Sequence, residues 1–186
     1  YKTYGELVAH AKANPGKLNY GSSGIGSVPH LAVVALAKAA NIDVFHVPHK
    51  GEADALASIL GGHITMFVSH PTFMTAHADK IRALFVVAPN RLPDHPNVPT
   101  IVEQGGPALS FEVWGGLAVP KGTPAPVLAA LENACKVATS SEAFTKQMQT
   151  LQTPVKYLDG KSFASFVAAE FERNGRLLRE SGIPKE

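Results

Sequence analysis

The sequence predicts an α/β fold with a mostly parallel sheet. In the first half of the chain, short strand-like segments alternate with segments whose apolar residues recur at helical spacing. Residues 81–88 are nearly all apolar, which is typical of a strand buried on both faces. Strands that alternate with helices favour parallel pairing through right-handed crossovers.

The first predicted unit is a strand, a glycine-rich loop and a helix. Ahead of it, apolar residues at helical spacing predict a helix over residues 5–13, which Asn14-Pro15-Gly16 ends. Residues 18–20 are then a short strand and residues 21–27 a glycine–serine loop. Residues 31–40 are rich in alanine and leucine, and Pro29 is suited to a first helical turn.

The same alternation continues along the chain. We expect strands at residues 44–47, 64–68 and 81–88, and helices at residues 53–60 and 72–78. Residues 89–122 are rich in proline and glycine, with one strand candidate at residues 111–119. The remainder is mainly helical, with helices at residues 125–138, 141–151 and 161–180 and a short strand at residues 155–158. These last helices need a sheet to pack on, and this part of the chain supplies almost none.

Composition excludes several classes of protein. The 17 Lys and Arg against 15 Asp and Glu give a net charge of +2, without the basic stripe that nucleic-acid binding needs. One cysteine excludes an internal disulfide framework and a cysteine-rich zinc site. No apolar run approaches the length of a transmembrane helix. The chain begins at Tyr1 without an initiator Met or a signal segment, so we expect a processed or incomplete N-terminus, which leaves the compartment open.

The glycine–serine loop is the strongest candidate site. Backbone N–H groups at a helix start lack partners inside the helix and lie at the positive end of its dipole, and the serine hydroxyls add donors. A P-loop needs a Lys before its Ser or Thr, and the Rossmann pattern needs a third glycine where Pro29 stands, so neither nucleotide motif fits. The pattern therefore favours a carboxylate, which two or three such donors can hold. A plain structural turn with satisfied serines is the alternative.

Two further loops are expected at the same edge of the sheet. His49-Lys50-Gly51 follows one predicted strand and precedes a helix, so Lys50 can supply charge and His49 a donor. Ser69 follows the next strand in the same way. A solvated surface lysine is the alternative interpretation of Lys50.

The sequence offers no convincing catalytic or metal site. None of the eight histidines forms the His-x-x-x-His pair of a zinc protease, and no Gly-x-Ser-x-Gly motif occurs. Cys135 lies in an alanine-rich helix, where a buried, inert thiol is expected. An enzyme that uses the glycine loop for a phosphorylated substrate is an alternative, but no pair of a base and a nucleophile is evident.

Several ordered segments together resemble one protein family. They are Leu18 to Gly24 with His30-Leu31-Ala32, His46 to Gly51 with Leu60-Gly61-Gly62, Lys80 to Leu84, Val98-Pro99-Thr100 with Glu103-Gln104-Gly105, and Trp114-Gly115-Gly116 with Gly122-Thr123-Pro124. In this order and spacing they resemble the extracytoplasmic solute receptors of tripartite tricarboxylate transporters, also called Bug or TctC-like receptors. The resemblance covers nearly all 186 residues.

The resemblance implies a two-lobed, type II periplasmic-binding-protein fold, α/β with mostly parallel sheets, whose first lobe is incomplete here. Residues 1–109 would form the second, inserted ligand-binding lobe, and residues 110–186 the hinge return and C-terminal helices of the first lobe. The implied function is that of a periplasmic receptor, not an enzyme, which captures a small organic carboxylate between its lobes and delivers it to membrane transporter subunits. It would use no cofactor or metal, bind no nucleic acid and not insert stably into the membrane. The alternative with the same architecture is the ligand-sensing effector domain of a cytoplasmic transcription regulator.

The resemblance also implies which residues would hold the ligand. The ligand loop of the family matches Gly21 to Ser27, whose amides and hydroxyls would take a carboxylate. The Val-Pro-Tyr-Lys-Gly loop of the family matches Val47 to Gly51, where His49 replaces the tyrosine and adds a donor and pH dependence. The implied ligand-binding residues are Gly21, Ser22, Ser23, Gly24, Gly26, Ser27, His49, Lys50, Gly51 and Ser69.

Overall fold

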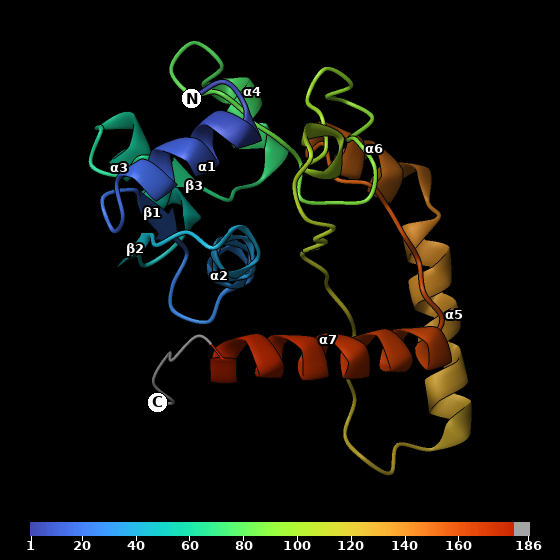
Figure 1. The fold of residues 1–186 in the computed structure, drawn as a ribbon. Coiled ribbons are helices and arrows are strands. Elements are labelled where there is room, and N and C mark those ends of the chain that lie inside the picture. The colour runs from blue at the N-terminus through green and yellow to red at the C-terminus, as the bar shows by residue number, and fades with distance from the viewer. Residues whose placement is uncertain (181–186) are drawn as a thin grey trace. The chain divides into compact units, whose positions relative to one another are not determined.

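The computed structural model describes residues 1–180 of the chain (Figure 1). These residues form two compact units. Unit 1 comprises Tyr1–Val113 together with the residues from Gly175 to the end of the described chain, and unit 2 comprises Trp114–Asn174. Each unit is described below by itself.

Unit 1 contains a three-stranded parallel sheet in the order β2-β1-β3. Its elements in chain order are α1 (Tyr4–Ala13), β1 (Asn19–Ser22), α2 (Val28–Ala40), β2 (Phe45–Pro48), α3 (Glu52–Leu60), β3 (Met66–Phe67), α4 (Pro71–Ala76) and a 3-10 turn, η1 (Val102–Gln104). The alternation of strands and helices and their parallel pairing confirm the prediction for this part of the chain. Because all three strands run the same way, their carboxyl ends meet at one edge of the sheet.

Local signals in the sequence account for the first elements. The hydroxyl of Thr3 accepts a hydrogen bond from the backbone N–H of Glu6 at 3.1 Å and caps α1. Proline stands in the first turn of α2, and Asn41 ends that helix in the left-handed conformation with φ of 50°. The predicted boundaries of both helices therefore agree with the structure to within a few residues.

The core of unit 1 forms where α1 packs on the sheet. Leu7, Ala11 and Leu18 are almost fully buried and contact Met66 of β3, together with partly buried residues just before β2 and between α4 and η1. A second cluster joins Tyr4 of α1 to Leu36 of α2 and to Ile101. These two clusters fix α1 and α2 on the sheet, and thereby fix the loop that joins β1 to α2.

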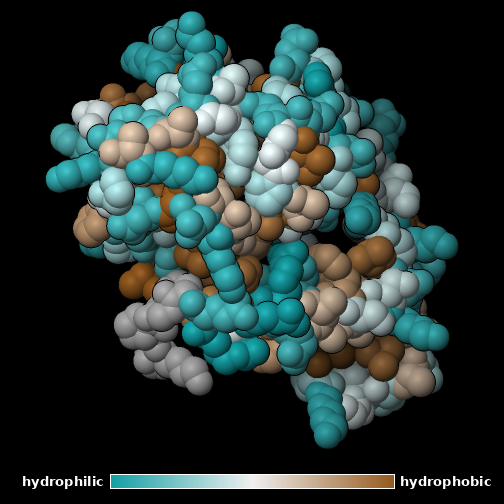
Figure 2. All heavy atoms as spheres, in the orientation of Figure 1, coloured by the Kyte–Doolittle hydropathy of each residue, from teal (hydrophilic) through white to brown (hydrophobic). Residues whose placement is uncertain are grey.

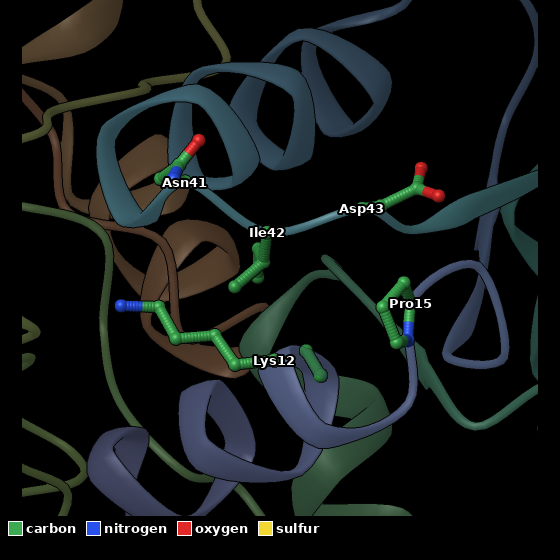
Figure 3. A pocket seen from close by; sticks show the side chains of 6 residues that line it. Lys12, Pro15, Asn41, Ile42 and Asp43 are labelled. Carbon is green, nitrogen blue, oxygen red and sulfur yellow. The ribbon is translucent and has the colours of Figure 1, made fainter.

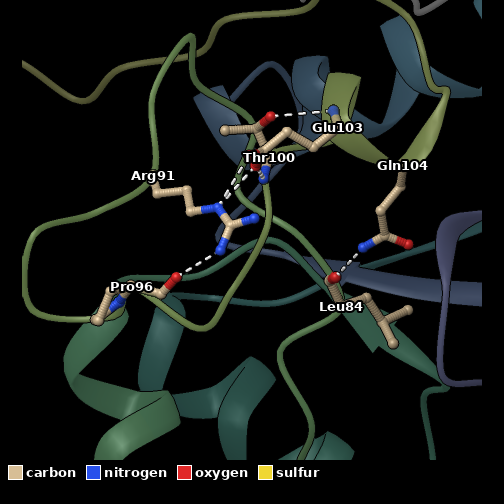
Figure 4. Close-up of polar contacts among 6 residues, drawn as sticks. All are labelled: Leu84, Arg91, Pro96, Thr100, Glu103 and Gln104. Carbon is tan, nitrogen blue, oxygen red and sulfur yellow. Dashed lines mark hydrogen bonds and ion pairs between the residues drawn. The ribbon is translucent and has the colours of Figure 1, made fainter.

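The predicted strand over residues 81–88 does not form. Val86 makes one isolated parallel bridge to Thr100, in which Val86 N–H donates to the Pro99 carbonyl and Ile101 N–H donates to the Val86 carbonyl. The side-chain amide of Gln104 donates to the Leu84 carbonyl, as Figure 4 shows. The apolar side chains of this segment are only partly buried, so the expectation of burial on both faces was also wrong, and the backbone groups find single partners in place of a neighbouring strand.

A polar cluster holds the segment around η1 (Figure 4). Thr100 N–H donates to the Glu103 carboxylate at 2.7 Å, and Glu103 N–H donates back to the Thr100 hydroxyl at 3.2 Å. This reciprocal pair is a capping box. The Arg91 guanidinium donates to both carboxylate oxygens of Glu103, at 3.0 and 2.9 Å. The hydrogen bonds from Arg91, followed by that from Thr100, lower the pKa of Glu103 to about 2.

Unit 2 is helical. It contains α5 (Ala125–Thr139), α6 (Glu142–Thr150) and most of α7 (Gly160–Glu180), in agreement with the three predicted helices. The strands predicted over residues 111–119 and 155–158 are absent from the described chain. Trp114 packs edge-on against Phe163 and Phe166, with ring centroids 5.3 and 5.7 Å apart. Cys135 is partly exposed, so the expectation of a buried thiol was wrong.

Apolar side chains remain exposed in unit 2 (Figure 2). They are Trp114, Leu117, Val119, Val127, Leu128, Val137, Leu151, Val155 and Phe171. The unit forms its helices but, within the described chain, has no strand on which their apolar faces can pack. Among the described helices, none is both long enough and apolar enough to cross a membrane.

Candidate functional site

Three loops lie at the carboxyl edge of the sheet in unit 1. The first joins β1 to α2, the second joins β2 to α3, and the third joins β3 to α4. This is the edge at which open parallel sheets bind ligands. All ten residues predicted to bind the ligand lie in these loops or in the adjoining ends of β1.

Ser22 anchors the start of the first loop. Strand β1 extends two residues further than predicted, so Gly21 and Ser22 belong to the strand. Ser22 is 1% exposed; its hydroxyl donates to the Gly24 carbonyl at 2.9 Å and accepts the Gly24 N–H at 3.3 Å. The Nε2 atom of His46 lies 2.7 Å from the same hydroxyl. Nε2 is therefore the nitrogen that His46 presents to Ser22, and its tautomer sets which group donates.

Gly24 and Gly26 give the first loop its shape. Their φ angles are +126° and +75°, which residues with a side chain rarely adopt. The Gly24 carbonyl also accepts the Ser27 hydroxyl at 2.7 Å and the Ser27 N–H at 3.3 Å. The Gly26 N–H donates to Nδ1 of His30 at 2.9 Å. Much of the hydrogen-bonding capacity of this loop is therefore used within it.

The remaining donors of the first loop have no partners among the described residues. They are the hydroxyl and N–H of Ser23, the N–H of Ile25, and the first N–H groups of α2, on Val28 and His30. No side chain caps the N-terminus of α2, and no acidic residue lies in its first turn. Free donors and the positive end of a helix dipole together favour an anion at this position.

Two stacked histidines lie behind the first loop. The rings of His30 and His46 are 3.9 Å apart and inclined by 10°, and Tyr20 stacks on His46 at 4.9 Å. Burial, and secondarily the neighbouring His46, lowers the pKa of His30 to about 4. Burial and the nearby His49 lower the pKa of His46, and burial raises the pKa of Tyr20 to about 12. Both imidazoles are therefore neutral at pH 7.

The second loop positions His49 over β1. Its N–H donates to the Ser22 carbonyl at 3.0 Å, and its ring lies against Gly21. Its Nδ1 is 3.4 Å from the Asp54 carboxylate, while its Nε2 is buried without a partner among the described residues. Asp54 also accepts the Lys50 N–H at 3.3 Å, and the Lys50 side chain is exposed. In this loop the carboxylate of Asp54, in the first turn of α3, therefore already accepts a backbone N–H.

In the third loop an internal carboxylate takes the donors. The Ser69 hydroxyl and the His70 N–H both donate to one oxygen of Glu52, at 2.7 and 2.6 Å. Glu52 lies in the first turn of α3, so this contact ties the second loop to the third. The first turn of α3 thus carries two acidic side chains, Glu52 and Asp54, whereas the first turn of α2 carries none.

The sequence did not point to His30, His46, Glu52 or Asp54 as parts of this site. The histidines are distant in sequence, and only the parallel register, which pairs Tyr20 with His46, brings them together. Ser22 and His46 form a contact between a hydroxyl and an imidazole that the sequence did not reveal. The Ser22 hydroxyl is nonetheless buried and bonded to the Gly24 carbonyl, so it is not accessible to a ligand as a nucleophile.

Other features of the described residues do not compete with this edge. No group of three or more His, Cys, Asp or Glu side chains among them is arranged to hold a metal ion. A pocket of about 340 Å³ lies between Lys12, Pro15 and residues 41–43 (Figure 3). The Lys12 amino group and the Asp43 carboxylate lie at opposite ends of it, at the amino ends of the strands. It is therefore not part of the candidate site.

Comparison with known proteins gives one consistent group. Residues 1–183 match the family described as "Tripartite tricarboxylate transporter family receptor". The "UPF0065 protein in gbd 5'region" of Cupriavidus necator is 30% identical over 99% of this chain and 56% of its own length. The chain thus spans little more than half the length of this relative.

Solved structures agree with the sequence comparison. The periplasmic binding protein BugD superimposes on 100% of this chain with a TM-score of 0.84 and 26% identity, and 64% of BugD is covered. MatC from Rhodopseudomonas palustris, solved with bound malate, covers 95% of this chain with a TM-score of 0.81 and 25% identity, and 62% of MatC is covered. The predicted fold, that of a periplasmic binding protein of the Bug or TctC group, is therefore confirmed.

Proposed function

This chain belongs to the tripartite tricarboxylate transporter receptor family, and we propose that it captures a small organic carboxylate at the carboxyl edge of the unit 1 sheet. The observation that carries the proposal is the set of free donors on Ser23, Ile25, Val28 and His30 at the uncapped start of α2. In this proposal the protein is a periplasmic receptor that hands its ligand to the membrane subunits of a tripartite transporter.

Nine of the ten predicted ligand-binding residues take distinct roles in this proposal, and Gly21 packs against the His49 ring. Ser23 donates directly to the ligand, while Gly24 and Gly26 supply the backbone shape. Ser22 and Ser27 hold the loop by their bonds to the Gly24 carbonyl. In the other two loops, His49, Lys50, Gly51 and Ser69 complete the edge, with Lys50 supplying positive charge and Ser69 acting through Glu52.

Charge supports a carboxylate over a neutral ligand. Hydrogen bonds to a charged group contribute about 1.5–3 kcal/mol each, and two or three of them account for micromolar binding. MatC, which shares the fold, was solved with malate, a dicarboxylate. The Ser22 hydroxyl is buried and engaged, which supports a protein that binds its ligand without converting it.

Calorimetry with a panel of ligands tests this function. Acetate, malate and citrate are compared with malamide, the neutral diamide of malate. We expect at least one acid to bind and malamide not to bind. Ser23→Ala should weaken binding of that acid by about tenfold or more, since it removes one charge-assisted hydrogen bond. Ser165→Ala, at an exposed serine of α7 in unit 2, is the control and should bind as the wild type does. Equal binding of malamide, or unchanged binding by Ser23→Ala, would contradict the proposal.

A further inference from the structure

The two stacked histidines contact opposite ends of the first loop. Nε2 of His46 is hydrogen-bonded to the Ser22 hydroxyl, where the loop begins, and Nδ1 of His30 accepts the Gly26 N–H, near its end. His30 itself is 3% exposed and lies at the start of α2. The pair therefore links the last residue of β1 to the last glycine before the helix.

We propose that His30 and His46 are positioning residues that hold the glycine–serine loop in its anion-binding shape, each through one particular ring nitrogen. This proposal rests on the proposed function for the identity of the anion, but its structural part concerns the ligand-free chain. Neither imidazole needs to touch the ligand. Each acts through the backbone or hydroxyl group to which it is bonded.

The bond to Gly26 requires one state of the His30 ring. A backbone N–H can donate only to an unprotonated nitrogen, so Nδ1 of His30 carries no proton and Nε2 carries it. Gly26 has φ of +75°, a backbone conformation that glycine adopts readily and other residues rarely. The direction of its N–H toward His30 depends on this conformation. Loss of the acceptor would leave that N–H unpaired and remove a restraint on the turn from Gly24 to Ser27.

Stacking fixes the two rings in place. With 3.9 Å between centroids and 10° between planes, neither ring can rotate without displacing the other. Tyr20 also lies against both rings, with centroids 4.9 Å from His46 and 6.1 Å from His30. His46 presents Nε2 to Ser22 and His30 presents Nδ1 to Gly26, so the two rings use different nitrogens.

This difference between the nitrogens yields a specific test. The side-chain amide of Asn ends about where Nδ1 of histidine lies, whereas that of Gln ends about where Nε2 lies. His30→Asn should therefore keep an acceptor for Gly26, and His30→Gln and His30→Leu should not. Conversely, His46→Gln should keep a hydrogen-bond partner for Ser22, and His46→Asn and His46→Leu should not. His10→Asn, at an exposed histidine of α1, is the matched control.

The first measurement is hydrogen exchange at the Gly26 amide of the whole chain by NMR, without ligand. We expect exchange about tenfold faster in His30→Leu and His30→Gln than in the wild type, which corresponds to one lost hydrogen bond. His30→Asn and His10→Asn should stay close to the wild type. Unchanged exchange in His30→Leu, or equal rescue by Gln and Asn at position 30, would overturn the proposal.

The second measurement is malate binding by the same variants at pH 7. We expect weaker binding in the variants that fail to restore the bond, with β1 still protected from exchange, and near wild-type binding in His30→Asn and His46→Gln. If the wild type binds none of acetate, malate and citrate while the exchange pattern holds, the carboxylate function fails and the positioning role stands. If malate binds equally to all variants, the positioning role is refuted.

Discussion

Gly21 is the position where the close packing behind the site is tested most simply. A Cβ atom added there would overlap Cδ1 of Ile64 and lie 3.2 and 3.3 Å from two atoms of the His49 ring. Ile64 is 3% exposed and cannot move into solvent. Overpacking of this kind costs about 1–3 kcal/mol, so we expect Gly21→Ala to lower the free energy of unfolding of unit 1 by that amount.

A double-mutant cycle identifies the cause of the loss. Ile64→Val removes the Cδ1 atom that the new methyl group overlaps and alone costs about 0.5–1.5 kcal/mol. In the double variant the total loss of unfolding free energy should be smaller than the sum of the two single losses, with a coupling of about 0.5–3 kcal/mol. Gly5→Ala is the matched control, because it makes the same chemical change at an open, exposed position of α1 and should stabilise by about 0.5–1 kcal/mol.

The assay is denaturant unfolding followed by the NMR signals of the β1 amides, since the single tryptophan lies in unit 2 and does not report on this sheet. Strict additivity of Gly21→Ala and Ile64→Val would refute the assignment of the loss to this contact. A stabilising effect of Gly21→Ala would refute the packing argument as a whole.

Three further predictions follow from the same region of the molecule. Because the pKa of His30 falls to about 4 in the folded state from 6.5, its neutral form adds about 3 kcal/mol of stability above pH 6.5, and this is lost as the pH falls toward 4. Unfolding midpoints measured across this range should fall in the wild type and fall less in His30→Asn; parallel curves would contradict it. Thr100→Ala should cost unit 1 about 1 kcal/mol by removing the cap of Glu103, and no change in the melting temperature would count against the capping box. Gly24→Val and Gly26→Val force a branched side chain into positive φ and should weaken both folding and carboxylate binding, with the larger loss in binding. Equal losses in calorimetry and unfolding would favour a purely structural turn.

Sequence reasoning succeeded where a local signal decides the structure. Pro29 in a first helical turn, Asn14-Pro15-Gly16 after α1 and the glycines of the first loop all act on the few residues next to them. The parallel sheet followed from alternation, because strands separated by helices of this length pair in parallel. These signals were sufficient to place the glycine–serine loop at the carboxyl edge of the sheet.

The strand predicted over residues 81–88 was wrong because an apolar sequence was taken as a sign of backbone pairing with a neighbouring strand. The apolar run over residues 81–88 reports that these side chains avoid water, and they are indeed partly buried. It does not report which groups accept their backbone hydrogen bonds. The side-chain amide of Gln104, for example, donates to the Leu84 carbonyl, and no pattern in a single sequence reveals this contact.

The polar contacts of unit 1 differ in how far they could have been predicted. Thr100 and Glu103 have the spacing of a capping box, so that pair was readable from the sequence. The stack of His30 on His46 depends on strand register and helix placement, neither of which spacing fixes. The contact of Glu52 with Ser69 depends on the same tertiary arrangement.

The measurement that tests the central claim most directly is an amide map of malate binding by NMR. Malate is titrated into the chain at pH 7, and the shift of every backbone N–H signal is followed. We predict the largest shifts at Ser23, Ile25, Val28 and His30, whose N–H groups lack partners in the structure. Saturable shifts confined to other residues, such as those around the pocket at Lys12, would contradict the assignment of the carboxylate site to this loop.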